Sequence, residues 1–277
     1  MTPFEKLEAI LACVQTDPGN RGLARDPVDN LFTATAGDYQ VSCQRLAETR
    51  QAVGIVTGFF IPSATRFETD GPLGAFFLER TLLSLGYTCS AVGEDPIESA
   101  FSAVRGRQNY HHVFPNSTTF NIAIERTGQA LDRNYYTMSG VAVGPVIDSL
   151  FDELPYSIGI GDGGNEIGMG KIPHETIVKN IPNGDLIHCR VPTDHLIVAG
   201  VSNWGAYALA AGVYVLRNEK PPANLFDPDY ERKILQLMVD AGPLVDGVTG
   251  KQEATVDGLS WDEYVKPLIR MREILEC

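Results

Sequence analysis

Short buried strands alternate with amphipathic helices from residue 52 onward, and this rhythm constrains the fold more than any other feature of the sequence. Apolar runs of strand length recur, with helical patterns between them. The predicted strands cover 52–60, 88–92, 120–124, 157–160, 186–191 and 195–199, and the predicted helices cover 72–85, 96–104, 146–154 and 204–216. Such alternation is typical of βαβ units. We therefore expect the α/β class, a mostly parallel sheet with helices on both faces.

Helical patterns also precede and follow this region. Thr2, Pro3 and Glu5 form a helix start, because threonine can cap, proline suits the first turn and glutamate sits at the third helical position. An apolar stripe continues this helix to Val14, and further helices are predicted over 31–49, 230–241 and 261–276. No repeat or long linker interrupts the chain. We expect a single α/β domain over residues 1–277 with an N-terminal helical segment.

Composition narrows the choice of partner and compartment. The 277 residues include 35 acidic and 22 basic side chains, a net charge of −13, which argues against nucleic acid and anionic membrane surfaces as partners. No apolar run approaches the roughly 18 residues that span a bilayer, and the N-terminus shows no secretory signal. The five cysteines are widely spaced and lack a C-x-x-C pair, which indicates a reducing compartment. We expect a cytoplasmic protein acting on a small molecule; the mitochondrial matrix and a homo-oligomer stay open.

The densest motif is the glycine-rich segment 159–171, which begins with a G-x-G-x-x-G match. A dinucleotide site is disfavoured, because Asp162 and Glu166 would repel a pyrophosphate, and the Walker pattern does not fit. Asp162, Asn165 and Glu166 offer oxygen ligands, and glycines let the backbone turn around an ion. Hard oxygen ligands favour Mg²⁺, Mn²⁺ or Ca²⁺ over Zn²⁺. The alternative is that Asp162 or Asn165 caps a helix and the glycines only permit a tight turn.

Acid and amide groups also follow other predicted strands. Glu68 and Asp70 come after the first strand, Glu125 ends another, and Ser202 and Asn203 follow a further one. The carboxyl ends of parallel strands share one edge of the sheet, where ligands bind in such folds. We therefore expect these groups to converge, although Asp70 could instead be the N-cap of the helix after it.

The basic candidates are fewer. Arg66, Arg126 and Lys171 flank the acidic loops and could hold substrate carboxylate or phosphate oxygens. The alternative for each is a solvated ion pair with a neighbouring acid. Arg21 is a further candidate for anion binding. No H-E-x-x-H or G-x-S-x-G pattern occurs, so zincin and α/β-hydrolase sites are excluded, and His195 is interpreted as a structural histidine.

These same residues carry a family resemblance over almost the whole chain. The matching pieces lie at 57–59 with 68–72, 124–126, 159–171, 198–205, 247–251 and 255–259, and the string G-D-G-G-N-E-x-G-M-G is long and specific. The chain resembles the D-glutamate cyclase C-terminal-type domain family. It departs at Thr127, where the family pattern has proline, which concerns the local turn. The resemblance implies an enzyme that converts D-glutamate to 5-oxo-D-proline with loss of water. Manganese-dependent phosphatase activity is also reported in the family, so a divalent metal is implied in both cases.

A mechanism follows as a hypothesis. A metal held by Asp70, Asp162, Asn165 and Glu166 would polarise the γ-carboxylate of D-glutamate, with Asp162 also counted as catalytic. Glu68 or Glu125 would take the ammonium proton before the amine attacks. The substrate-binding candidates are Arg66, Arg126, Lys171, Ser202 and Asn203. Two alternatives stay open, a Mn- or Mg-dependent phosphatase acting on a phosphorylated metabolite with the same acids, and a non-catalytic nucleotide-binding module.

Overall fold

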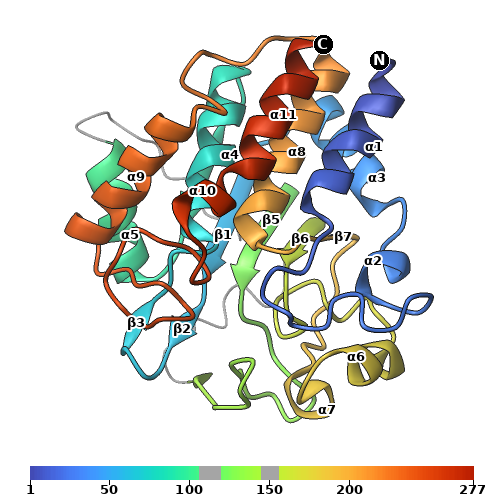
Figure 1. Ribbon diagram of the computed structural model, residues 1–277, viewed down its shortest axis with the longest axis vertical. Coiled ribbons are helices and arrows are strands. Elements are labelled where there is room, and N and C mark those ends of the chain that lie inside the picture. Colours follow the sequence, from blue (N-terminus) through green and yellow to red (C-terminus); the bar gives the residue numbers. More distant parts are fainter. Residues whose placement is uncertain (106–119, 145–155) are drawn as a thin grey trace.

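A five-stranded sheet forms the centre of the computed structural model, which describes residues 1–105, 120–144 and 156–277 (Figure 1). All neighbouring strands in this sheet are parallel. In spatial order they are β4 (Cys89–Val92), β1 (Val53–Gly58), β5 (Phe120–Arg126), β6 (Ser157–Gly161) and β7 (His195–Val198). The predicted α/β class and parallel sheet are confirmed.

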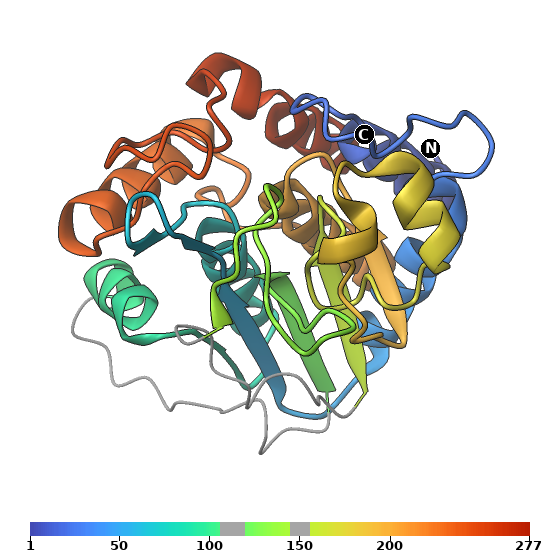
Figure 2. The same ribbon diagram turned by 90° about the horizontal axis from the view of Figure 1, so that it is seen from below.

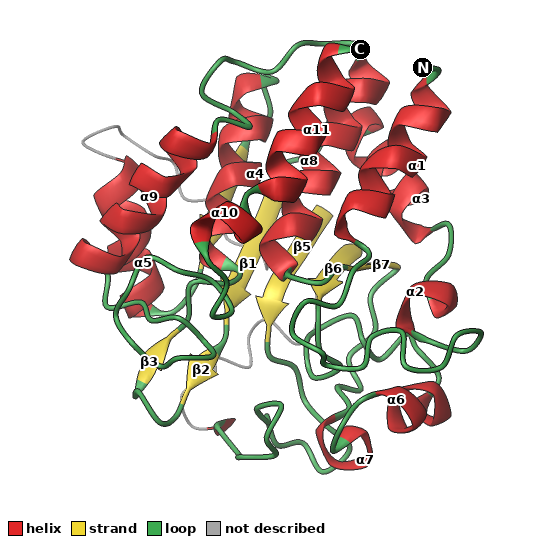
Figure 3. Cartoon of the chain, in the orientation of Figure 1, coloured by secondary structure: helices red, strands yellow, loops and turns green. Residues whose placement is uncertain are grey.

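The strand order reverses direction between β1 and β5. The chain steps from β1 to β4 on one side, crosses back to β5 on the other side of β1, and then continues outward through β6 and β7. In open parallel sheets, ligands bind in the crevice outside the carboxyl ends of the strands at such a switch point. Loops gather at these carboxyl ends, below the arrowheads in Figure 3. The topology therefore leads us to expect a binding site beyond the ends of β1 and β5.

Two helices with little polar surface cover one face of the sheet. They are α4 (Pro72–Ser84) and α8 (Ser202–Arg217), which pack against each other and against the central strands. The first thirteen residues of α8 are all buried, as expected for a helix that is apolar on every side. Phe77 and Tyr207 join the two helices with ring centroids 4.5 Å apart. Outside α8 lie α1 (Pro3–Val14) and α11 (Lys266–Glu276), which form a further layer (Figure 2).

The glycine-rich segment packs on the opposite face of the sheet. Ile167 contacts a small apolar cluster formed by Val56, Val92 and Ala123. This approach requires a glycine in β6, because a Cβ on Gly159 would lie 2.7 Å from the Ile167 carbonyl oxygen. The segment is thereby fixed against the sheet instead of projecting into solvent.

Most predicted elements outside the sheet are present. The predicted capping box of α1 is confirmed: the Thr2 hydroxyl accepts from the Glu5 N–H, and the Glu5 carboxylate accepts from the Thr2 N–H. The remaining helices and the small antiparallel hairpin are α2 (Leu31–Ala34), α3 (Asp38–Glu48), β2 (Phe60–Ile61), β3 (Arg66–Phe67), α5 (Asp95–Arg105), α6 (His174–Asn180), α7 (Gly184–Ile187), α9 (Pro228–Ala241) and α10 (Trp261–Tyr264).

Four predictions differ from the structure or fall outside it. The helix expected over 261–276 is divided at Val265 into α10 and α11. The helix expected over 31–49 is two helices, because Gly37 has φ +90° and breaks the path. The strand expected over 186–191 is wrong: α7 occupies its start, and the N–H groups of Cys189 and Arg190 bond to loop carbonyls, not to the sheet. The helix expected over 146–154 lies outside the described residues. None of the helices in the described ranges is long and apolar enough to cross a membrane.

Candidate active site

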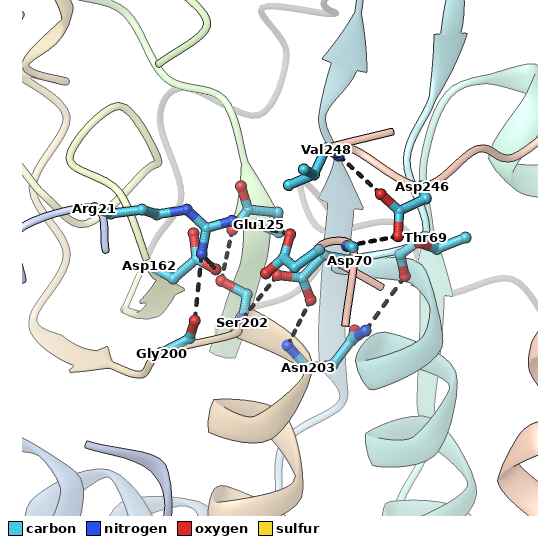
Figure 4. A network of polar contacts seen from close by, with 12 residues as sticks. Arg21, Thr69, Asp70, Glu125, Asp162, Gly200, Ser202, Asn203, Asp246 and Val248 are labelled. Atoms are coloured by element: carbon cyan, nitrogen blue, oxygen red, sulfur yellow. Dashed lines mark hydrogen bonds and ion pairs between the residues drawn. The ribbon is translucent and has the colours of Figure 1, made fainter. Parts of the chain in front are cut away.

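Charged side chains from segments far apart in the sequence point toward one another at the carboxyl edge of the sheet (Figure 4). Asp70 comes from the segment after β1, Glu125 from the end of β5 and Asp162 from the end of β6. Ser202 begins α8, and Arg21 arrives from the loop between α1 and α2. The structure thus brings the strand-end residues together, as a parallel sheet predicts.

The Asp70 side chain accepts hydrogen bonds at the N-terminus of α8, and the Asn203 side chain does the same at the N-terminus of α4. Asp70 Oδ1 accepts from the N–H of Asn203 at 2.8 Å and Asp70 Oδ2 accepts from the N–H of Ser202 at 2.9 Å, both at the start of α8. In return, Asn203 Oδ1 accepts from the N–H groups of Gly71 at 2.9 Å and Gly74 at 2.6 Å, at the start of α4. The alternative that Asp70 is the N-cap of the helix after it is wrong, since Gly71 holds that position. These contacts fix both side chains at the site.

Glu125 is held in an unusual backbone conformation. Its φ is +43°, and the register between β1 and β5 shifts beside it, at Thr57 and Gly58. A left-handed conformation is costly for a residue other than glycine, and such strain concentrates at functional sites. The buried carboxylate accepts a hydrogen bond from the Ser202 hydroxyl at 2.6 Å. The strand end is therefore shaped to hold this carboxylate against the start of α8.

One arginine bridges two further carboxylates. Arg21 Nη1 lies 2.7 Å from Asp162 Oδ2, and Arg21 Nη2 lies 2.9 Å from Asp257 Oδ1. Nη1 also donates to the carbonyl of Gly200 at 3.3 Å. Asp162 and Asp257 are both about nine-tenths buried or more. The guanidinium is thus a fixed positive charge within the acidic cluster.

Glu166 and Asn165 organise the glycine-rich loop itself. The Glu166 carboxylate accepts from the N–H of Asp162 at 3.1 Å and from the N–H of Gly164 at 2.7 Å. Asn165 Nδ2 donates to the carbonyl of Tyr136 at 2.7 Å. Asn165 Oδ1 is fully buried and has no hydrogen-bond partner in the described part of the chain. A ligand with positive charge would satisfy this oxygen.

Two groups of three carboxylates share Asp162. The first contains Asp70, Asp162 and Asp257, and the second contains Glu125, Asp162 and Glu166. Within each group, one oxygen from every residue lies within 4.8 Å of the others. The Arg21 guanidinium already contacts two acids of the first group, and three backbone N–H groups occupy Asp70. In the second group Asp162 alone contacts the guanidinium, so this group keeps more uncompensated negative charge and is the better placed of the two to take a cation.

Burial raises the pKa of the five acids that surround the site. It is the largest cause at each of Glu68, Asp70, Glu125, Asp162 and Asp257. The pKa of Asp70 rises to about 7; the charge of Asp257 adds to the effect of burial, and the N–H groups at the start of α8 oppose it. Arg21 limits the rise in the pKa of Asp162. Carboxyls with raised pKa values can both accept and donate protons near neutral pH.

A cavity of about 310 Å³ opens onto this cluster, at the small end of the range for small-molecule sites. Its charged lining consists of Arg21, Glu68, Glu125, Asp162 and Asp257, and its apolar lining includes Phe59, Ile61, Met138, Val141 and Val248. The Glu68 carboxylate lies against the backbone of the C-terminal region, because a Cβ on Gly247 would be 1.6 Å from Glu68 Oε2. A larger residue at Gly247 would displace this carboxylate.

The three predicted basic residues do not line this cavity. Lys171 lies 2.5 Å from Asp38 Oδ2 and donates to a backbone carbonyl. Arg126 follows Glu125 but pairs with Glu94 at 2.7 Å. Arg66 lies in β3 and lines a different pocket, where its Nη1 donates to the carbonyl of Pro243 at 3.4 Å.

Asp257 is the charged residue of the site that sequence reasoning did not single out. It lies outside the strand–helix alternation, in a C-terminal loop, with φ +56°. The available signal was its place in the string Thr-Val-Asp-Gly-Leu, which matched the family pattern without a role. Arg21 was a candidate only by residue type.

The family model described as D-glutamate cyclase-like, C-terminal, matches residues 10–272. The chain belongs to this family. D-glutamate cyclase, mitochondrial, of Homo sapiens is 31% identical to it, over 76% of this chain and 39% of the human protein, so the chain spans about two fifths of that relative's length. The membership expected from the motifs is confirmed.

A crystal structure of exonuclease RecJ bound to manganese is also similar, with a TM-score of 0.36 and 12% identity, covering 85% of this chain and 47% of that one. A likeness at this level supports no conclusion about function.

Proposed function

We propose that this chain converts D-glutamate to 5-oxo-D-proline with loss of water. The observation that carries the proposal is the small cavity walled by buried carboxyls, in a chain of the D-glutamate cyclase-like family. An acidic wall suits a substrate that carries an ammonium group. The activity of the longer human relative is compatible with it.

The reaction needs two proton movements. The α-ammonium loses one proton before its nitrogen attacks the γ-carboxyl carbon and a second once the C–N bond has formed, and two protons reach the γ-oxygen that leaves as water. Glu68 and Glu125 both line the cavity, and burial raises the pKa of each. An ionised carboxylate here takes the ammonium proton, and a protonated one donates a proton to the γ-oxygen that leaves. Holding the two ends of the substrate together adds an orientation effect, but the reaction is already intramolecular.

The donor set fits a hard divalent cation. Asp162 and Glu166 supply carboxylate oxygens, and the unpartnered Asn165 Oδ1 belongs to the same loop. Glu125 has an oxygen within 4.8 Å of both acids and completes the set where Glu68 is the group that transfers the proton. Oxygen ligands of this kind suit Mn²⁺ or Mg²⁺, with Ca²⁺ a weaker choice for catalysis. A cation bound here would supply polarisation of the γ-carboxylate, which makes its carbon a better electrophile.

The structure bears on the two alternatives, a nucleotide-binding module and a metal-dependent phosphatase, in different ways. A nucleotide-binding module needs free backbone N–H groups in the glycine loop, and the Glu166 carboxylate already accepts from those of Asp162 and Gly164. A phosphatase would bring a dianion to a wall whose charged groups, in the described part of the chain, are four acids and one guanidinium, which favours a substrate with an ammonium group over a phosphate. The name of the human relative is compatible with a matrix location, and we propose a small-molecule substrate as the main partner.

Product formation tests the proposal directly. The purified chain, stripped with EDTA and reloaded with Mn²⁺ or Mg²⁺, is incubated with D- or L-glutamate, and 5-oxoproline is measured by mass spectrometry against an enzyme-free blank. We expect product from D-glutamate, and a loss of roughly 100-fold or more in Asp162→Asn. Lys171→Ala is the matched control, because Lys171 lies outside the cavity lining. Hydrolysis of phosphomonoesters without any 5-oxoproline would overturn the proposal in favour of the phosphatase.

A further inference from the structure

Arg21 is the single positive charge among the described residues that line the cavity. The other titratable groups of that lining are all acids: Glu68, Glu125, Asp162 and Asp257. A substrate carboxylate that entered next to these acids would be repelled unless a cation received it. The predicted anchors Arg126 and Lys171 are bound elsewhere.

The loop that carries Arg21 is built to present it. The Asp17 carboxylate accepts from the N–H groups of Arg21 at 2.9 Å, Gly22 at 2.8 Å and Leu23 at 3.1 Å, which closes a tight turn at this point. Gly22 has φ +98°, and a Cβ there would lie 2.2 Å from the carbonyl oxygen of Asn180. Only glycine fits this position without displacement. The backbone of Arg21 is therefore fixed before any ligand arrives.

The guanidinium is fixed as well and still has donors to offer. The described contacts, to Asp162, Asp257 and the Gly200 carbonyl, use three of its five N–H groups. Its side chain remains 17% exposed and is part of the cavity lining. A planar guanidinium held by two carboxylates loses little freedom on binding a third, which favours recognition of a carboxylate.

We propose that Arg21 binds the α-carboxylate of the substrate amino acid. This inference rests on the proposed cyclisation, in which the γ-carboxyl reacts and the α-carboxylate keeps its charge throughout. Arg21 takes the α-carboxylate, the acids of the cavity take the ammonium, and the γ-carboxyl goes to the reacting position. Three groups of one chiral molecule then meet three distinct sites, which lets the site distinguish the two enantiomers of glutamate.

The α-carboxamide analogue of D-glutamate isolates this contact, because it lacks the α-carboxylate and keeps the reacting groups. Steady-state kinetics are measured for both substrates with wild type, Arg21→Met and Arg21→Lys. We expect Arg21→Met to lose about 100-fold in kcat/KM for D-glutamate, mainly through a higher KM, and only a few-fold for the carboxamide. Arg21→Lys keeps the charge but loses the planar fork, so its loss for D-glutamate is intermediate. Arg25→Met, an exposed arginine of the same loop, is the control and leaves both substrates unaffected.

Equal losses for both substrates would overturn the inference and assign Arg21 to holding Asp162 and Asp257 in place. Calorimetric binding of D-glutamate and its carboxamide separates this result from failure of the cyclisation itself. If wild type makes no 5-oxoproline but binds D-glutamate more tightly than the carboxamide, and Arg21→Met abolishes that preference, the carboxylate contact stands and the reaction is wrong. Absence of any preference in wild type refutes the contact. Thermal unfolding of each variant checks that it is folded.

Discussion

Substituting Asp70 by asparagine separates two opposing effects on one carboxylate. Asp70 accepts three backbone N–H groups, two of them at the N-terminus of α8, and a negative charge at a helix N-terminus is stabilising. Burial and the nearby charge of Asp257 oppose ionisation and raise the pKa of Asp70 to about 7. The direction of this shift means that burial and repulsion outweigh the cap. The asparagine side chain in the Asp70→Asn variant would keep one acceptor oxygen and carry no charge.

The magnitude follows from linkage between protonation and folding. The pKa of Asp70 is about 7 in the native state and 3.8 by its ordinary value, so between these values the native state binds a proton that the unfolded chain has released. Stability is therefore lost as pH rises through this window. From about pH 5 to about pH 8 the wild type should lose roughly 3 kcal/mol relative to Asp70→Asn. The two proteins should be similar near pH 5, and the variant should be the more stable near pH 8.

Urea unfolding in EDTA at both pH values measures these differences. Asp246→Asn is the control, because the buried Asp246 accepts from the N–H groups of Val248, Thr249 and Gly258, and its replacement leaves donors unpaired. We expect that control to be destabilised at both pH values by about 1–3 kcal/mol. If Asp70→Asn is also less stable than the wild type by the same amount at both pH values, then the hydrogen bonds of Asp70 to the start of α8 dominate its energetics. That result would refute the reasoning from burial and charge repulsion.

Two further predictions use contacts around the site. The hydroxyl of Ser202 donates to Glu125, and this hydrogen bond lowers the pKa of the Glu125 carboxyl. Ser202→Ala removes the hydrogen bond, so the limb of the kcat/KM pH profile that Glu125 sets should move to higher pH. An unmoved profile would mean that another group titrates. Burial lowers the pKa of His188 from 6.5 to about 4, so the unfolded chain binds the extra proton and stability falls as pH falls through this window. Between pH 8 and pH 5 this effect should cost the wild type about 2 kcal/mol of unfolding free energy, measured with urea, and His188→Gln should not show that loss. Equal losses in the two proteins would contradict this prediction.

The sequence predicted the position of most of the acidic cluster because the argument needed only topology. The carboxyl ends of parallel strands lie at the same edge of a sheet, and Asp70, Glu125 and Asp162 all come at or after the ends of strands predicted to be parallel. Their proximity was expected without any knowledge of side-chain contacts. The roles assigned to them stay predictions until activity is measured.

Side-chain direction could not be predicted in the same way. Arg126 follows Glu125 directly, yet it pairs with Glu94 while Glu125 contacts Ser202. The positive φ of Glu125 and the shift in register beside β1 determine which of the two faces the cavity, and neither has a clear signature in the residue types. Lys171 lies close in sequence to the acidic loop, but its ammonium pairs with Asp38 and the residue is not part of the cavity lining.

Residues from outside the alternating core were the hardest to find. Arg21 and Asp257 lie in loops near opposite ends of the chain, and they meet 2.9 Å apart only because the terminal helices pack outside α8. The local sequence pattern does not predict the contact between Arg21 and Asp257, because that contact depends on the tertiary packing of distant elements.

The packing of α4 against α8 explains how like charges can be held together here. The two helices are buried along most of their length, and the hydrophobic burial between them stabilises a fixed relative position of their N-termini. Asp70 and Asn203 sit at that junction, and Ser202 extends it to Glu125. Asp70 and Glu125 cannot move away from the cluster without breaking their hydrogen bonds to residues at the start of α8. The stability of the helix packing therefore offsets the cost of burying these acids, and the proposed proton transfer uses carboxyls whose pKa is raised by that burial.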